Sequence, residues 1–204
     1  MHTIKGKFIS IFILCMLTLI GSVSYLTLNK GNNDNSTSQN TMGNKLGGDF
    51  SLPIADGVFK LGDYRGKVVV LYFGYASCPD VCPTALALLG NTLKKMTKDV
   101  TDQIQPLFIS VDPARDKLTA LKQYGQYFHP SLLAGTTEQA KIDTLVRQYG
   151  AFYSFTTLEN SAMGYSVDHS SRLYLINKNG ILADTVSHGD IQQDLAQKLL
   201  KLTN

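Results

Sequence analysis

The sequence predicts an α/β fold in which a mixed β-sheet is covered by helices on both faces. Two observations support this prediction. Short runs of β-branched and aromatic residues, typical of buried strands, alternate with segments in which apolar residues recur every three or four positions, as in amphipathic helices. Near the end of the chain, an Asn-Gly pair between two apolar runs is typical of a β-hairpin. Strands and helices that alternate and then end in a hairpin indicate a mixed sheet between helical layers.

The composition is consistent with one globular domain and short appended segments. The chain has 204 residues, of which 44% are apolar, and a net charge of +3. Two of its 19 basic residues, Lys5 and Lys7, precede an apolar amino-terminal stretch, which leaves 17 basic against 16 acidic residues in the rest of the chain. This balance, without a basic cluster, argues against a nucleic-acid partner.

Residues 8–28 contain no charged residue, and we expect residues 1–28 to be a membrane anchor or signal segment. A transmembrane helix needs about 20 mostly apolar residues, whereas the apolar core of a cleaved signal usually has about 7–15. The small residues of Ser22-Val23-Ser24 keep a cleavage site as the alternative. The positive-inside rule places Lys5 and Lys7 in the cytoplasm. Because no Arg-rich transit sequence precedes the segment, we expect a bacterial inner-membrane protein whose carboxy-terminal domain faces the periplasm.

Residues 29–48 are polar and rich in Asn, Ser, Thr and Gly. Such a segment cannot bury enough apolar surface to become ordered, so we expect a flexible tether. The globular domain is then expected to span residues 49–204.

Near the start of this domain, residues 50–61 predict a hairpin that turns at Asp56-Gly57. Residues 68–73 predict a buried strand. The helix that follows is indicated by apolar residues at regular steps: Leu86, Leu89, Leu93 and Met96. Pro83 is expected to open this helix with Cys82 just before it, because proline suits the first helical position and restricts the residue that precedes it.

The remaining elements alternate in the same way. Strands are expected at residues 106–111, 172–176 and 181–186, and helices at 118–128, 142–149 and from 191 onwards. Thr137 and Asp190 are expected to cap the last two helices.

Cys78 and Cys82 lie at the predicted turn between the strand and the helix. A helix amino terminus stabilises a thiolate there and makes it a better nucleophile or metal ligand. The two sulfurs could also form a disulfide if the turn is tight. Structural disulfides are common outside the cytoplasm, but closing so short a loop gains little stability. A redox pair or a metal site therefore explains this location better than a structural disulfide.

A soft metal ion would need a third ligand, for which histidine is the best candidate. His2 is expected across the membrane, His129 at the end of a helix and His188 in an exposed turn. His169 ends a turn that leads directly into the strand at 172–176, so its ring could face the mouth of the same sheet. Because an isolated histidine is usually structural, the spacing alone leaves its role open.

Three separated motifs resemble the Sco/SenC family, whose members are copper-binding, thioredoxin-like proteins of cytochrome c oxidase assembly. Cys78-Pro79-Asp80-Val81-Cys82-Pro83 is similar to the CxxxCP motif of that family. Residues 110–116 (SVDPARD) are similar to its SVDPxRD stretch, and residues 167–171 (VDHSS) match its VDHSS segment. The motifs occur in the family's order and together span most of residues 49–204. The departures, at 117–118 and 177–180, lie in turns away from the motifs.

The resemblance implies a thioredoxin-like fold in which Cys78, Cys82 and His169 jointly bind copper. Two thiolates and one imidazole suit Cu(I), and with a further oxygen or nitrogen donor they can hold Cu(II). Zinc is the main competitor, but structural zinc usually has four protein ligands.

Three further residues are candidates for supporting roles around such a site. Asp168 could orient the imidazole of His169 through its other ring nitrogen, or could be a solvated carboxylate. Asp80 could tune the charge of the thiolates or cap the helix. Arg115 could face the site or form a salt bridge with Asp116 or another surface carboxylate.

The resemblance also implies a choice between two functions. As a metallochaperone, the protein would deliver copper to the dinuclear site of cytochrome c oxidase subunit II. As a thiol-disulfide reductase, it would use Cys78 and Cys82 as a redox pair that keeps the cysteines of that subunit reduced. Another copper chaperone or a thioredoxin-like reductant would be a further partner. A peroxidase that uses Cys78 is a third possibility, but fold alone is no evidence for it.

Overall fold

The structure is a computed structural model that describes residues 46–159 and 161–204, and Leu46–Asn204 forms one compact unit. The expected anchor and most of the expected tether lie outside the described residues. Within the described part of the chain, no helix is long and apolar enough to cross a membrane. The first described residues already form hydrogen bonds with the rest of the domain. Gly47 donates its N–H to the carbonyl of Gln148, and the Tyr149 hydroxyl donates to the carbonyl of Gly48, both at 2.8 Å.

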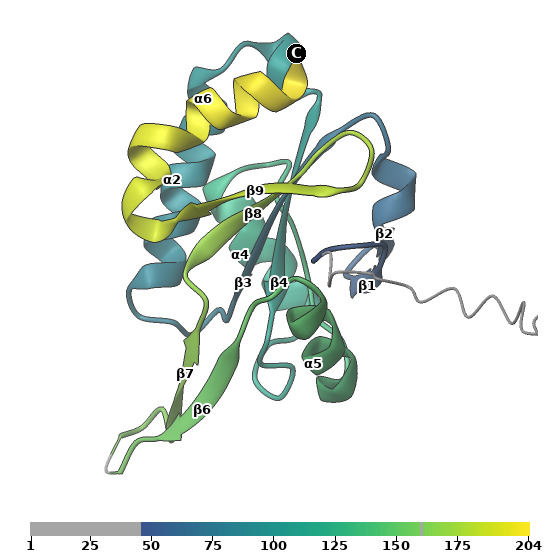
Figure 1. Cartoon of the computed structure of the whole chain (residues 1–204). Coiled ribbons are helices and arrows are strands. Elements are labelled where there is room, and N and C mark those ends of the chain that lie inside the picture. The colour runs from purple at the N-terminus through teal and green to yellow at the C-terminus, as the bar shows by residue number, and fades with distance from the viewer. Residues whose placement is uncertain (1–45, 160) are drawn as a thin grey trace, which may run out of the picture. The chain divides into compact units, whose positions relative to one another are not determined.

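A seven-stranded mixed sheet forms the centre of the domain, with the strand order β2-β1-β5-β4-β3-β8-β9 (Figure 1). Its strands are β1 (Ser51–Ile54), β2 (Gly57–Lys60), β3 (Val68–Gly74), β4 (Ile104–Ser110), β5 (Leu133–Gly135), β8 (Arg172–Ile176) and β9 (Leu182–Ser187). The pairs β3–β4 and β4–β5 are parallel, and the other pairs are antiparallel. Every residue of β3 and β4 is buried, as expected for strands covered on both faces.

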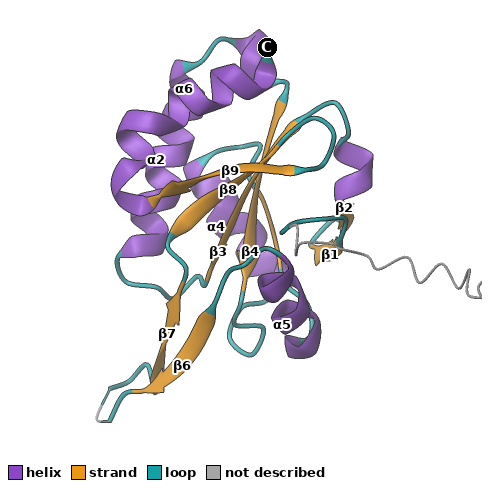
Figure 2. Cartoon of the chain, viewed as in Figure 1, coloured by secondary structure: helices purple, strands orange, loops and turns teal. Residues whose placement is uncertain are grey.

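Helices alternate with strands along most of the described chain, whereas β1–β2 and β8–β9 follow each other directly (Figure 2). The helices are α2 (Val81–Lys95), α3 (Lys98–Thr101), α4 (Leu118–Phe128), α5 (Gln139–Gln148) and α6 (Ile191–Thr203), with short 3-10 turns η1 (Leu61–Tyr64) and η2 (His188–Asp190). Helix α2 packs against both α4 and α6. The predicted α/β architecture is therefore confirmed.

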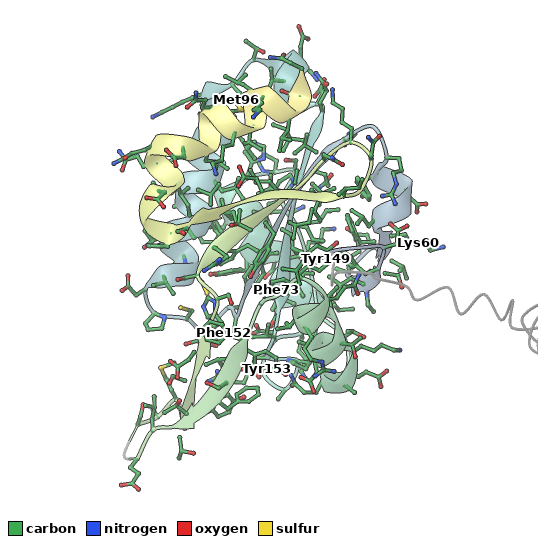
Figure 3. The ribbon with its side chains drawn as sticks, viewed as in Figure 1. Lys60, Phe73, Met96, Tyr149, Phe152 and Tyr153 are labelled. Carbon is green, nitrogen blue, oxygen red and sulfur yellow. The ribbon has the colours of Figure 1, made fainter. Side chains whose placement is uncertain are left out.

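Neighbouring aromatic residues of β3 show that both faces of the sheet are covered. Tyr72 lies 6.3 Å from Phe108, which lies 5.4 Å from Tyr124 of α4, as measured between ring centroids. The next residue, Phe73, points to the opposite face and lies 6.3 Å from Tyr149, just after α5 (Figure 3). Each face of the sheet thus has its own aromatic cluster.

A second, two-stranded sheet was not predicted. Strands β6 (Tyr153–Thr157) and β7 (Tyr165–His169) form an antiparallel ribbon that projects from the domain (Figure 1). Most of its residues are at least partly exposed, so the apolar signal of a buried strand is missing from its sequence. His169 therefore ends a strand rather than the expected turn.

The amino-terminal ends of three helices differ from the predictions, either in the residue at which the helix begins or in how it is capped. Helix α2 begins at Val81, so Cys82 lies inside its first turn and Pro83 is its third residue. Proline fits there because the first N–H groups of a helix need no intrahelical partner. Glu138, rather than Thr137, stands at the cap of α5, and Asp190 stands at the cap of α6 without a side-chain capping hydrogen bond.

The close contact between α2 and the end of α4 generates a stability prediction. A Cβ atom on Gly90 would lie 2.5 Å from the backbone oxygen of Phe128. We expect Gly90→Ala to lower the free energy of unfolding by about 1–3 kcal/mol, because backbone atoms cannot move aside as a flexible side chain can. Urea denaturation measures this change. Gly62→Ala is the control, since a Cβ atom there meets nothing within 4 Å; equal losses in both variants would contradict the packing argument.

Candidate metal centre

Two segments that are distant in the sequence bring Cys78 and Cys82 together with His169. Cys78 lies in the turn after β3, Cys82 in the first turn of α2, and His169 at the end of β7. One ligand atom from each residue lies within 4.8 Å of the other two. The Sγ atom of Cys82 is 3.1 Å from Nε2 of His169, a residue 87 positions later. Within the part of the chain that the structure describes, this cluster forms a candidate metal centre.

The cysteine turn is held by the segment that follows β4. Ala76 donates its N–H to Oδ2 of Asp116 at 2.9 Å, and Ser110 donates its hydroxyl to the same oxygen at 2.5 Å. Asp116 is only 6% exposed. This buried carboxylate therefore ties the turn before Cys78 to the end of β4.

Gly74, the last residue of β3, makes room for the second sulfur. A Cβ atom at this position would lie 2.7 Å from Sγ of Cys82 and 2.9 Å from the ring of Phe108. The absence of a side chain at Gly74 lets the Cys82 sulfur pack directly against the end of the strand.

Both cysteines are free, and their environments make them chemically different. A hydrogen bond from Cys82 holds the pKa of the Cys78 thiol far below its usual range, and a hydrogen bond from His169 and nearby backbone N–H groups act in the same direction. The pKa of Cys82 is raised, first by its hydrogen bond with Cys78 and then by burial. Cys78 is therefore the thiolate of the pair, and Cys82 retains its proton.

Two aromatic rings hold the imidazole of His169. The rings of Tyr72 and Tyr75 lie 6.0 and 5.9 Å from it between centroids, and both are nearly perpendicular to it. Its Nδ1 atom is 3.2 Å from the backbone carbonyl of Ser170. This contact fits Nδ1 as the donor to Ser170, and it turns Nε2 towards the sulfur of Cys82.

The ribbon that carries His169 is fixed by a buried ion pair. Arg115 pairs through Nε with the carboxylate of Asp112, which is fully buried. Arg115 also donates from Nη1 to the carbonyl of Tyr165 on β7 at 3.0 Å, and its guanidinium lies 3.8 Å from the centre of the Tyr165 ring. The Tyr165 hydroxyl donates to Oδ1 of Asp112 at 2.9 Å. Charge, hydrogen bonds and cation–π attraction thus connect β7 to the segment after β4.

The other strand of the ribbon is attached to α5. The Tyr153 hydroxyl donates to the carboxylate of Asp143 and accepts a hydrogen bond from the amide of Gln139. Next to it, Phe152 donates its N–H to the Ser170 hydroxyl at 2.9 Å and accepts from the Ser170 N–H at 3.0 Å. Both strands of the ribbon are therefore attached to the rest of the domain, β7 through Arg115 and β6 through α5.

Asp168, Asp80 and Arg115, the three residues predicted to support the site, do not contact the three candidate ligands in the ways expected from the sequence. The carboxylate of Asp168 accepts from the Thr156 hydroxyl at 2.8 Å, and the Ser170 carbonyl is what faces the ring of His169. Asp80 is exposed at the cap of α2 without a side-chain capping hydrogen bond. Arg115 pairs with Asp112 rather than with Asp116.

Sequence reasoning missed the contributions of Tyr72, Tyr75 and Asp112. Tyr72 is indistinguishable from an ordinary core residue within an apolar strand. The only available signal for Asp112 and Asp116 was their place in the SVDPARD motif, directly after a buried strand.

A pocket of about 330 Å³ opens above the candidate metal centre. Its walls include Cys78, Val81, Phe152 and His169. Cys78 is 8% exposed, whereas Cys82 is fully buried. The described domain is therefore a thioredoxin-like α/β protein in which a cysteine pair and a histidine face a small pocket.

Comparison with known proteins identifies the family. The SCO1/SenC family model matches residues 38–204, and the chain belongs to this family. An SCO2-like protein of Rickettsia prowazekii is 39% identical over 137 residues, which cover 67% of this chain and 66% of that protein. The chain therefore spans about two thirds of the length of this relative, and about half of the length of the bovine and mouse SCO2 homologues.

Solved structures show the same fold. The apo Sco1 protein of Thermus thermophilus is 30% identical, with a TM-score of 0.70 over 77% of this chain and 91% of its own. ScoI of Bradyrhizobium japonicum with copper bound is also 30% identical, with a TM-score of 0.68 over 77% of this chain and 99% of its own.

The unequal acidities of the cysteines predict a distinctive alkylation profile. We expect Cys78 of the reduced, metal-free protein to react with iodoacetamide at a rate that is nearly constant between about pH 6 and 8, because its pKa lies well below the usual value of about 8.5. Peptide mass mapping after timed alkylation locates the label. An ordinary thiol would react about tenfold faster for each pH unit in this range, and such a rise at Cys78 would contradict the assignment.

The buried ion pair predicts a loss of stability. Arg115→Met removes the cation and leaves the Asp112 carboxylate buried without its charged partner, so we expect the free energy of unfolding to fall by about 3 kcal/mol. Urea denaturation measures the loss. Lys98→Ala is the control, because the Lys98–Asp102 pair is exposed and we expect little change. Similar losses in the two variants would contradict the claim that the buried ion pair stabilises the fold more than an exposed one.

Proposed function

We propose that this protein is a copper metallochaperone that binds the ion through Cys78, Cys82 and His169. We further propose that it delivers copper to the dinuclear site of cytochrome c oxidase subunit II. The observation that carries the proposal is the convergence of two sulfurs and one imidazole nitrogen within 4.8 Å. Membership of the SCO1/SenC family and the likeness to a copper-bound ScoI structure support it.

The chemistry of the three donors favours copper. Thiolates select soft ions such as Cu(I), and imidazole suits copper in either oxidation state. Structural zinc usually takes four protein ligands, and this cluster offers three. Burial of Cys82 and partial burial of His169 limit the access of water to the bound ion.

The environment of the donors also suits a cargo that must leave again. Cys78 and His169 line the pocket, so the ligands of a receiving protein can approach them from solvent, while Cys82 stays behind them. Ligand exchange then transfers the ion without breaking a covalent bond of the protein. Because Cys82 retains its proton in the free protein, uptake of copper displaces that proton.

A thiol-disulfide reductase that keeps the cysteines of subunit II reduced is the second candidate. The observation in its favour is the pairing of a low-pKa thiol, Cys78, with a protonated neighbour, Cys82. Such a pair can attack a disulfide and then resolve the mixed intermediate. A thioredoxin-like reductant, or another copper chaperone, would then be a further partner.

The location of the protein is part of the proposal. Residues 1–28 would serve as a membrane anchor or signal segment and residues 29–48 as a tether. The domain would then work on the periplasmic side of a bacterial inner membrane.

Substitution of His169 separates the two candidate functions. We expect His169→Ala to weaken Cu(I) binding by more than about 100-fold, which exceeds the loss of 10- to 100-fold typical of removing a supporting partner. The reduction potential of the cysteine pair should change little. Competitive titration with a Cu(I) chelator measures the affinity, and His129→Ala is the control, because its ring contacts Ser131 instead.

The oxidation state of the cysteines provides the second arm of this experiment. Reduced protein should bind about one copper ion per chain, and the disulfide form markedly less, because Cu(I) requires thiolates. Unchanged copper affinity in His169→Ala would exclude the three-ligand site and make the reductase the better account.

A further inference from the structure

We propose that Phe152 is the apolar anchor of a docking surface for the protein that receives copper. This inference rests on the proposed metallochaperone function. The docking surface consists of Phe152, Val81 and Phe155. Phe152 and Val81 line the pocket of about 330 Å³ above Cys78 and His169, which we call the ligand pocket, and Phe155 of β6 lines a second cavity together with Phe152.

Phe152 is a large apolar side chain that the domain leaves in water. It is 62% exposed, and it lies at the base of the β6–β7 ribbon (Figure 3). Its backbone N–H and carbonyl both form hydrogen bonds with Ser170, at 2.9 and 3.0 Å. An apolar side chain on a fixed backbone costs little conformational entropy when a partner covers it, which is typical of interface anchors.

Phe152 also stands between two cavities. One is the pocket of about 330 Å³ that contains Cys78 and His169. The other, of about 400 Å³, lies between α5 and β6 and is lined by Phe155 and Arg147. Phe155 is 47% exposed, so exposed aromatic side chains border both cavities. Because Phe152 lines both cavities, it connects this surface to the metal centre.

Ligand exchange specifies the occupant of this surface. Cys82 is fully buried and Cys78 is 8% exposed, so the receiving thiolate or imidazole must enter the ligand pocket to reach the ion. The residues that flank this ligand in the partner must then contact the walls of the pocket. Phe152 and Val81 are exposed or partly exposed apolar residues of these walls. The partner is therefore a polypeptide that presents copper-binding thiol or imidazole side chains beside apolar residues.

Copper transfer between proteins, compared with removal by a small chelator, tests the inference. The full-length chain is loaded with Cu(I) and mixed with increasing amounts of the reduced, metal-free copper domain of cytochrome c oxidase subunit II. We expect Phe152→Ser to raise the half-saturating concentration of this acceptor by about tenfold, and Phe152→Leu to have a smaller effect. The Cu(I) affinity should stay unchanged, because Phe152 supplies no ligand atom. The rate of removal by bathocuproine disulfonate should change far less than the transfer does, because a small chelator enters the pocket without covering the surface along β6.

Tyr127→Ser is the matched control, since Tyr127 is 83% exposed on α4 and does not line the ligand pocket. It should transfer copper as the wild type does. Wild-type transfer by Phe152→Ser would overturn the inference alone, as would an equal defect in Tyr127→Ser or an altered Cu(I) affinity. A wild-type chain that passes no copper to the acceptor would overturn the proposed function and the inference with it.

Two further measurements on the same variants distinguish the copper-receiving protein from two other partners that could cover this surface. Sedimentation velocity would detect a second copy of the chain, and flotation with phosphatidylethanolamine–phosphatidylglycerol vesicles would detect a membrane surface. A change in either measurement caused by Phe152→Ser, without a transfer defect, would assign the surface to that occupant and overturn the inference.

Discussion

The candidate metal centre depends on two buried carboxylates in the segment between β4 and α4. Asp116 holds the turn before Cys78, and Asp112 holds Arg115 and Tyr165, which fix the ribbon that ends at His169. One short segment thus positions both ligand-bearing parts of the chain. Because a buried carboxylate without its partners is costly, these connections keep the distance between the cysteine turn and the ribbon nearly constant.

Such preorganisation matches the requirements of a carrier of copper. The ligands are in place before the ion arrives, so binding needs little rearrangement of the backbone. The same arrangement makes the two cysteines unequal, because Cys82 is enclosed by Gly74 and α2 while Cys78 borders the pocket. A structural disulfide would gain little from this asymmetry, whereas metal exchange and thiol chemistry both use it. Metal exchange accounts in addition for the imidazole beside Cys82.

The parts of the structure that follow local rules could be predicted from the sequence. The apolar run of β3, the cysteine turn and the amphipathic helices depend on neighbouring residues, and their order indicated the mixed sheet. The β6–β7 ribbon could not be predicted, because its residues are mostly exposed and its stability comes from partners on other elements. The partner of Arg115 and the rings around His169 depend on the tertiary fold, so the sequence could indicate the three candidate ligands but not the groups that position them.

X-ray absorption spectroscopy of the Cu(I)-loaded protein tests the central claim most directly, because it counts the atoms bound to the ion. A site made by Cys78, Cys82 and His169 gives two sulfur ligands and one nitrogen ligand around a single copper, and the nitrogen contribution is lost when His169 is replaced. A spectrum with sulfur ligands alone, or with a copper–copper distance from a cluster shared between chains, would contradict this claim.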